Sequence, residues 1–165
     1  MANASLRIDE ATEQDIPTIL QFIKGLADFE RLAQSVEANE EILRETLFGK
    51  RRYAEVLIAR FNNEPAGFAL FFHNYSTFLA RPGIYLEDLF VQPAMRGKGI
   101  GKALMVSLAR LAVDRNCGRL EWAVLNWNES AIGFYKNLGA VPLHDWAVFR
   151  LTGEALVDLG KKRLK

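Results

Sequence analysis

The sequence has little cysteine, little histidine and almost no excess charge. Cys117 is its one cysteine, so no disulfide can form within the chain, and a reducing compartment suits it. The 21 basic and 20 acidic residues leave a net charge of +1, which excludes the electrostatic footprint of a nucleic-acid or anionic-membrane partner. His73 and His144 stand alone without ligand spacing around them, so we expect no metal.

Long apolar runs and a leader pattern are also missing. No stretch reaches the length of a transmembrane helix, and the start MANASLRIDEATEQD lacks the basic and apolar regions of a signal peptide. We therefore expect a soluble, cytoplasmic protein. With 165 residues, half of them hydrophobic, the chain has the size and composition of a single domain spanning residues 1–165.

Hydrophobic periodicity predicts strands and helices in an order that suits a mixed sheet. Strands are expected at 6–8, 53–60, 66–72, 84–91, 119–124, 141–143 and 147–151. Helices are expected at 12–29, 39–48, 99–115, 130–138 and 152–160. Strands that follow one another directly pair antiparallel, whereas the strand–helix–strand unit over 84–124 predicts one parallel pair. The predicted fold class is α/β (α+β), with a mixed, mostly antiparallel sheet flanked by helices.

The segment VQPAMRGKGIGKAL, residues 91–104, places Gly97, Gly99 and Gly101 at the start of a predicted helix. Glycine permits positive φ and the close approach of a ligand, and the first N–H groups of a helix have no partner within it. Together with the helix dipole, these groups form an anion site. Three basic residues add positive charge there: Arg96, Lys98 and Lys102. We expect a phosphate as the ligand, and more specifically a pyrophosphate.

Other uses of a glycine-rich turn fit this segment less well. A P-loop is excluded because Ala103 follows Gly101-Lys102 where a magnesium-binding Ser or Thr is needed, and Arg96 stands where the first glycine is needed. A dinucleotide fingerprint requires G-x-G-x-x-G early in a βαβ unit, whereas the spacing here is G-x-G-x-G after the fourth strand. The alternative to a ligand site is a turn that only lets helix and strand pack.

RGKGIG at 96–101 fits the Arg/Gln-x-x-Gly-x-Gly/Ala signature of the GNAT N-acetyltransferase family, which the chain resembles over residues 5–151. YLEDLFV at 85–91 and WNESAIGFYKNLGA at 127–140 stand at the family's spacing. The set is most similar to the spermidine/spermine (diamine) acetyltransferase branch, including its thialysine-acetylating members. The resemblance implies the GNAT fold and acetyl-CoA as acetyl donor. The residues that it assigns to acetyl-CoA are Leu89, Phe90, Val91, Arg96, Gly97, Lys98, Gly99, Ile100, Gly101, Lys102, Asn128, Glu129, Ser130 and Ala131.

Acetyl transfer from a thioester to an amine needs a neutral amine and a protonated leaving thiolate. A lysine-like amine has a pKa of about 10.4, so its deprotonation at pH 7 costs roughly 4–5 kcal/mol. Glu87 is the base candidate, and the resemblance implies that it helps to remove the amine's proton, directly or through water. Tyr135 is the acid candidate, and the match to FYK implies that it donates to the sulfur of coenzyme A.

Each of these polar residues also has a purely structural alternative. Glu87 and its neighbour Asp88 could pair with an arginine or cap a helix, since a buried carboxylate needs a partner. Tyr135 could be a core aromatic, and Asn128 could serve as a helix cap, alone or while also touching the pantetheine arm.

For the acceptor amine, the resemblance points to seven residues: Phe29, Glu30, Glu87, Glu121, Trp122, Ala123 and Asp145. Asp145 fits least well, because its spacing differs from that branch by two. The polyamine enzymes carry an acidic residue and a tryptophan shortly before YLED, whereas residues 74–86 here contain no carboxylate and include Arg81. This departure favours a short diamine or a lysine analogue over a long polycation.

The sequence therefore predicts an acetyl-CoA-dependent N-acetyltransferase acting on a small primary amine (a diamine, a polyamine or a lysine analogue). Transfer would be direct, without an acyl-enzyme. The alternatives are a protein lysine or N-terminal acetyltransferase and a non-catalytic coenzyme A-binding regulator. The resemblance also implies a homodimer in which each site draws residues from both subunits.

Overall fold

The computed structural model describes residues 5–162, so the first four and last three residues of the predicted domain lie outside the described residues. The chain divides into two compact units, Met1–Ala123 and Val124–Lys165. The first contains β1 (Leu6–Glu10), α1 (Ile16–Phe29), α2 (Glu40–Leu43), β2 (Glu55–Phe61), β3 (Glu64–Ser76), β4 (Arg81–Val91), α3 (Ile100–Asp114) and β5 (Leu120–Trp122). The second contains α4 (Glu129–Asn137) and α5 (Gly153–Gly160).

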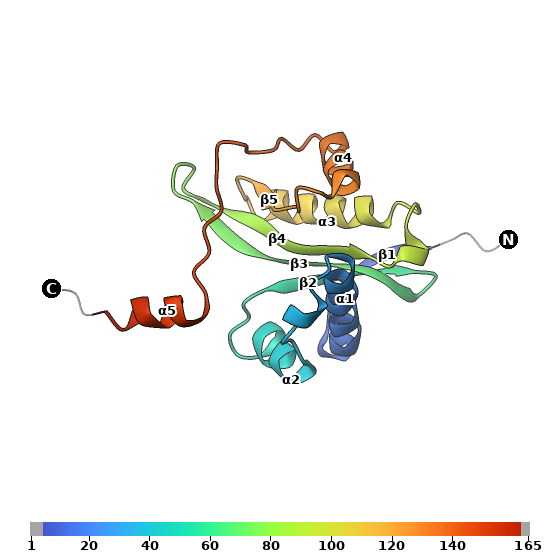
Figure 1. The fold of residues 1–165 in the computed structure, drawn as a ribbon. Helices are drawn as coiled ribbons and strands as arrows, with labels where there is room; N and C mark the ends of the chain where they lie inside the picture. Colours follow the sequence, from blue (N-terminus) through green and yellow to red (C-terminus); the bar gives the residue numbers. More distant parts are fainter. Residues whose placement is uncertain (1–4, 163–165) are drawn as a thin grey trace. The chain divides into compact units, whose positions relative to one another are not determined.

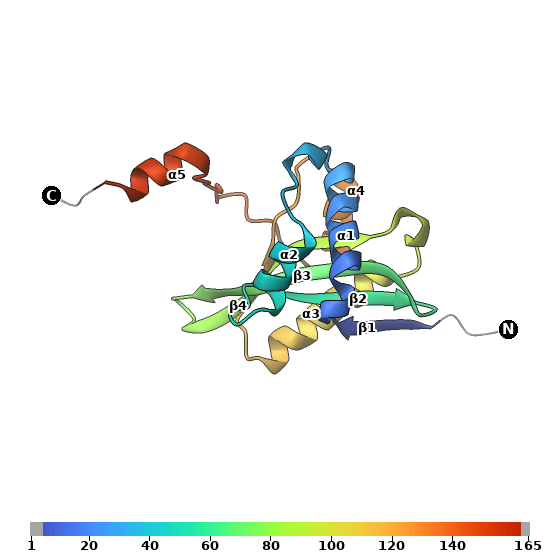
Figure 2. The same ribbon diagram turned by 90° about the horizontal axis from the view of Figure 1, so that it is seen from below.

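The five strands of the first unit form one sheet in the order β1-β2-β3-β4-β5. Neighbouring strands run antiparallel except β4 and β5, which pair in parallel from Ile84↔Leu120 to Leu86↔Trp122. Helices α1 and α2 cover one face and α3 covers the other (Figure 1). The view from below shows α1 crossing the strands (Figure 2). The predicted mixed sheet with one parallel pair and flanking helices is confirmed.

Aromatic side chains join α1 to the sheet. Phe22 packs against Phe68 of β3 and Phe90 of β4, with ring centroids 5.6 and 5.8 Å apart, and all three rings are buried. A Cβ on Gly25 would lie 2.8 Å from the ring of Phe90. The helix therefore comes this close to β4 because the residue there is glycine.

Side chains cap the N-termini of two helices near the predicted positions. Asp15 Oδ2 accepts the Thr12 N–H at 2.9 Å, in a short 3₁₀ turn that leads into α1. Asn39 Oδ1 accepts the Ile42 N–H at 2.9 Å at the start of α2. Thr152 precedes α5 as predicted, but its side chain makes no capping hydrogen bond.

Helices α1 and α4 end in the same motif with different residues at its critical position. After α1, the Arg31 N–H donates to the Asp28 carbonyl at 3.2 Å and the Leu32 N–H donates to the Ala27 carbonyl at 2.8 Å. This Schellman pattern requires a left-handed residue, and Arg31 fills the position with φ 61°. Gly139 fills it after α4 with φ 90°, as its place in the sequence predicts.

The strands predicted at 141–143 and 147–151 are wrong. Residues 141–151 form no strand and their side chains are exposed. Strand backbone needs a hydrogen-bonding neighbour, and within residues 5–162 no ladder includes this segment. The strand predicted at 119–124 is also shorter, because β5 pairs with β4 over only three residues. By contrast, β3 and β4 are longer than predicted, since they pair with one another as far as Ser76↔Arg81.

Candidate active site

The glycine-rich segment forms an open turn between β4 and α3. A 3₁₀ turn over Pro93–Met95 follows β4, and Gly97 and Gly99 then adopt φ values of 77° and 76°. Gly99 is the N-cap residue of α3. A Cβ on either glycine would meet no atom of the described chain within 4 Å, so a ligand can approach the backbone here. The unpaired N–H groups and the dipole of α3 suit a phosphate group.

Two of the three predicted cations lie against aromatic rings. Arg96 Nε donates to the Val91 carbonyl at 3.1 Å, and the guanidinium lies 5.0 Å from the ring centroid of Phe29. Lys98 Nζ lies 4.8 Å from the ring centroid of Phe61, the last residue of β2. Lys102 is exposed in the first turn of α3, and Ile100 beside it is buried.

A β-bulge at Glu87 separates the two carboxylates of β4. Leu70 on β3 pairs with Asp88, yet the next pair is Phe71↔Leu86, so Glu87 is an extra residue on β4. Asp88 therefore shares with Leu70 the face that α1 covers. Leu86 shares with Phe71 the opposite face, where α3 lies. Glu87 itself is exposed.

Two carboxylates act on the carboxyl of Asp88 where α1 ends beside β4. Burial first, then the charges of Glu87 and Glu30, raise the pKa of Asp88 to about 6. Burial also raises the pKa of Glu30 above its ordinary value. Groups with these properties suit the binding of a cationic amine and the acceptance of its proton. The sequence suggested only a structural role for Asp88, as a partner of an arginine or a helix cap, because the charges that act on its carboxyl depend on the fold.

The predicted acceptor residues on and after β5 lie near a polar cluster. Glu121 Oε2 accepts from Asn74 Nδ2 at 2.8 Å and lies 2.8 Å from Arg119 Nε. Trp122 is half-buried and Ala123 is exposed. The carboxylate of Glu121 is therefore engaged by partners of its own on β3 and before β5.

The backbone of β4 changes partners along its length. β5 pairs only with Ile84–Leu86, and in the described part of the first unit no strand lies beside Leu89–Val91 on that edge. On the other edge these residues pair with Gly67–Ala69 of β3. An extended ligand arm can therefore add to β4 at Leu89–Val91 in the manner of a strand.

Helix α4 in the second unit contains the remaining predicted donor-site residues. Asn128 Oδ1 accepts the Ala131 N–H at 3.2 Å, so the side chain caps the helix. Burial raises the pKa of the Tyr135 phenol to about 12, which keeps the group protonated and able to donate at physiological pH. Glu129 and Ser130 are exposed in the first turn, and Asp145 is exposed beyond the helix.

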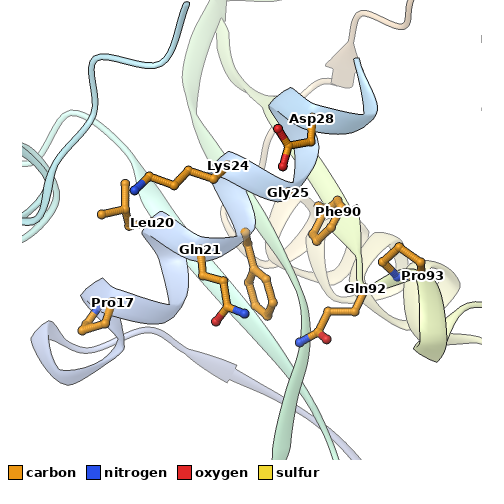
Figure 3. A pocket seen from close by; sticks show the side chains of 10 residues that line it. Pro17, Leu20, Gln21, Lys24, Gly25, Asp28, Phe90, Gln92 and Pro93 are labelled. Atoms are coloured by element: carbon orange, nitrogen blue, oxygen red, sulfur yellow. The ribbon is translucent and has the colours of Figure 1, made fainter. Parts of the chain in front are cut away.

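A groove that the sequence analysis did not predict lies beside α1. Its volume is about 520 Å³, and Phe90, Gln92 and Pro93 line it opposite Gln21 and Gly25 (Figure 3). Gln92 is held in place because its Nε2 donates to the Pro65 carbonyl at 2.9 Å. Gly25 in an otherwise regular helix was the one sequence signal of close backbone contact here.

Neither a metal cluster nor a spanning helix is found in the described chain. Within residues 5–162, no three His, Cys, Asp or Glu side chains gather to hold a metal ion. No helix in the same range combines the length and apolar character needed to cross a membrane.

A family model and similar curated proteins both indicate an acetyltransferase. The model of the acetyltransferase (GNAT) family matches residues 21–140. The chain is 39% identical to thialysine N-epsilon-acetyltransferase of Bos taurus, covering 96% of this chain and 99% of the relative. It is 34% identical to L-ornithine N5-acetyltransferase of Arabidopsis thaliana, covering 94% of this chain and 88% of the relative.

Solved structures agree with this fold. An integron cassette protein from the mobile metagenome of V. cholerae superposes with a TM-score of 0.80 at 28% identity, covering 96% of this chain and 99% of the other. An aminoglycoside acetyltransferase from a soil metagenomic sample superposes with a TM-score of 0.76 at 19% identity, covering 90% of this chain and 97% of the other.

Proposed function

Because the chain belongs to the acetyltransferase (GNAT) family and is an N-acetyltransferase, we propose that it transfers the acetyl group of acetyl-CoA directly to a short diamine or a lysine analogue. One observation carries this proposal. The first unit contains both a glycine turn suited to an anion and a group of three neighbouring carboxylates. The turn suits a donor that carries a pyrophosphate, and the carboxylates suit a cationic acceptor.

The proposed donor site uses backbone more than side chains. The N–H groups of residues 97–102 would hold the pyrophosphate, since Gly97 and Gly99 leave the approach open. The unpaired edge of Leu89–Val91 and the residues Asn128–Ala131 would bind the pantetheine arm. Lys102 is exposed at the helix start and adds charge there, whereas the side chains of Arg96 and Lys98 support the turn through Phe29 and Phe61.

In the proposed reaction the amine nitrogen attacks the thioester carbonyl and the carbon–sulfur bond breaks. Glu87 accepts the proton that the ammonium form of the acceptor must lose, directly or through water. Tyr135, whose pKa of about 12 leaves it protonated at neutral pH, donates its phenolic proton to the leaving sulfur. The nitrogen loses its second proton as the amide forms, and that proton restores the phenol, directly or through water. No covalent bond to the protein forms, so both substrates must be bound together.

The acceptor site is proposed to select a cation by charge. Glu30, Glu87 and Asp88 bring three carboxylates to the end of α1. Phe29, Trp122 and Ala123 would line the same acceptor site. Glu121, which also binds Asn74 and Arg119, and the exposed Asp145 would add negative charge for the acceptor's second amine. A short diamine or lysine analogue is favoured because residues 74–86 supply no further carboxylate and include Arg81.

The active form is proposed to be a cytoplasmic homodimer with residues of both subunits in each site. Support comes from the extent of apolar surface in residues 141–151, where Trp146 is 79% exposed and Phe149 is 94% exposed. Apolar surface of this kind favours a protein interface. Analytical ultracentrifugation would show a concentration-independent dimer, and a monomer at all concentrations would refute the assembly.

Two-substrate kinetics test the proposed reaction. Direct transfer gives intersecting double-reciprocal lines, whereas an acyl-enzyme gives parallel lines and would refute the mechanism. Glu30→Gln should raise KM for putrescine and a lysine analogue about three-fold more than for a monoamine of similar length, because it removes one attraction for the second charge. Equal effects on monoamines and diamines would remove Glu30 from the acceptor site.

A further inference from the structure

The side chain of Arg96 contacts both strand β4 and helix α1. Its Nε donates to the carbonyl of Val91, the last residue of β4, at 3.1 Å. Its guanidinium lies 5.0 Å from the ring centroid of Phe29, the last residue of α1. An arginine stacked on a ring and also donating through Nε has a defined orientation, which lysine cannot reproduce.

The position of Phe29 matters because Glu30 follows it directly. Glu30 is the C-cap residue of α1, and its N–H donates to the Leu26 carbonyl at 2.9 Å. The charge of Glu30 reaches Asp88 on β4 and raises the pKa of that carboxyl. Any contact that fixes the last turn of α1 therefore also fixes the spacing between these two carboxylates.

The groove beside α1 reaches the last turn of the helix. Gly25 and Asp28 line the groove on the helix side, and Pro93 lines it on the side of the segment that leads to Arg96 (Figure 3). The groove therefore lies between the helix and this segment. The long side chain of Arg96 spans from this segment to Phe29 at the helix end.

We propose that Arg96 is a positioning residue that holds Phe29, and through it Glu30, at the distance from β4 that a diamine acceptor requires. The inference rests on the proposed function and deepens it, since it assigns the side chain of a phosphate-turn residue to acceptor selection. If Arg96 acted only through its charge, its replacement would affect only the binding of coenzyme A.

Lys98 provides the matched control. It lies in the same turn, has the same charge and makes the same kind of contact, but with Phe61 on β2 rather than with α1. Arg96→Lys keeps the charge and should raise KM for putrescine about three- to ten-fold more than KM for a monoamine of similar length. Lys98→Gln should weaken coenzyme A binding and leave the ratio of putrescine to monoamine KM as in the wild type.

A titration of Asp88 without ligand tests the role of Arg96 independently of the acceptor class. Phe29→Leu removes the ring that Arg96 contacts and leaves every charge in place, whereas Phe61→Leu does the same for Lys98. Carboxyl NMR should show the titration midpoint of Asp88 falling in Phe29→Leu, because Glu30 is released, and staying at the wild-type value in Phe61→Leu. An unchanged midpoint in Phe29→Leu, or an Arg96→Lys variant with wild-type KM ratios, would overturn the proposal. Failure of wild type to acetylate any diamine would instead refute the proposed acceptor.

Discussion

Leu86 and Asp88 lie two residues apart on β4 but belong to opposite faces of the sheet, because the bulge at Glu87 inserts an extra residue between them. Leu86 is buried on the face of α3. Asp88 lies instead on the face of α1, where Glu30 and burial act on its carboxyl. One added residue thus places Leu86 in the core on one face and the carboxylate of Asp88 on the other face, beneath α1.

Stability should depend on pH through Asp88. Its pKa is about 6 in the folded chain against an ordinary 3.8, so the folded state binds more protons than the unfolded state between these values. Folding stability therefore falls as the pH rises through this window, by at most about 3 kcal/mol. Asp88→Asn removes the titration, so denaturant unfolding should show its stability relative to wild type increasing from pH 4 to pH 7. A difference that stays constant across that range would contradict the assignment.

Tyr135→Phe should lower kcat and leave coenzyme A affinity unchanged, since it removes only the hydroxyl. Loss of a general acid lowers the rate by roughly 10²–10⁴-fold. Single-turnover kinetics at saturating substrates measure the chemical step, and calorimetry with coenzyme A serves as the control. A variant that turns over at the wild-type rate, with chemistry rate-limiting in both enzymes, would refute the acid role.

Gly99→Ala should weaken coenzyme A binding roughly ten-fold or more. The residue has φ 76°, so a Cβ costs about 1–2 kcal/mol in strain and also enters the space through which a ligand would approach the turn. Gly133→Ala in α4 is the matched control, because its Cβ also meets no described atom and its φ is not positive. Calorimetry should show lost affinity in the first variant only, and the control should gain stability from its better helix propensity.

Arg31→Gly and Gly139→Ala should change thermal stability in opposite directions. Both residues occupy the left-handed position of a Schellman motif, with φ 61° and 90°. Glycine relieves strain at the end of α1 and alanine introduces it at the end of α4, each by about 1 kcal/mol. Calorimetric unfolding measures both, and the same sign for the two substitutions would contradict the motif.

Local patterns were sufficient to predict most of the fold. The glycines and the apolar periodicity of 91–104 predicted the turn and α3, and Asn39, Asn128 and Gly139 each marked a helix end that the structure confirms. Residues 141–151 show where such patterns fail, because alternation of apolar residues indicates a strand only if a neighbour pairs with it.

The arrangement of the site depended on contacts that the sequence does not encode locally. The bulge at Glu87 arises from the register with β3, and it decides the face on which Asp88 lies. The contact between Arg96 and Phe29 joins residues far apart in the chain, so a motif that treats Arg96 only as a phosphate-binding charge does not reveal it. Composition and spacing therefore predicted candidate site residues, whereas packing determines which side chains within one unit act on one another.

Competition among acceptors shows which class of amine the enzyme acetylates. Wild-type protein is mixed with limiting acetyl-CoA and equal concentrations of a lysine analogue, putrescine, spermine and a basic peptide, and mass spectrometry identifies the acetylated products. Product ratios under competition report the ratios of kcat/KM. We expect the lysine analogue and putrescine to carry most of the acetyl groups, with spermine acetylated at a lower level. Acetylation mainly of spermine or of the peptide would contradict this expectation.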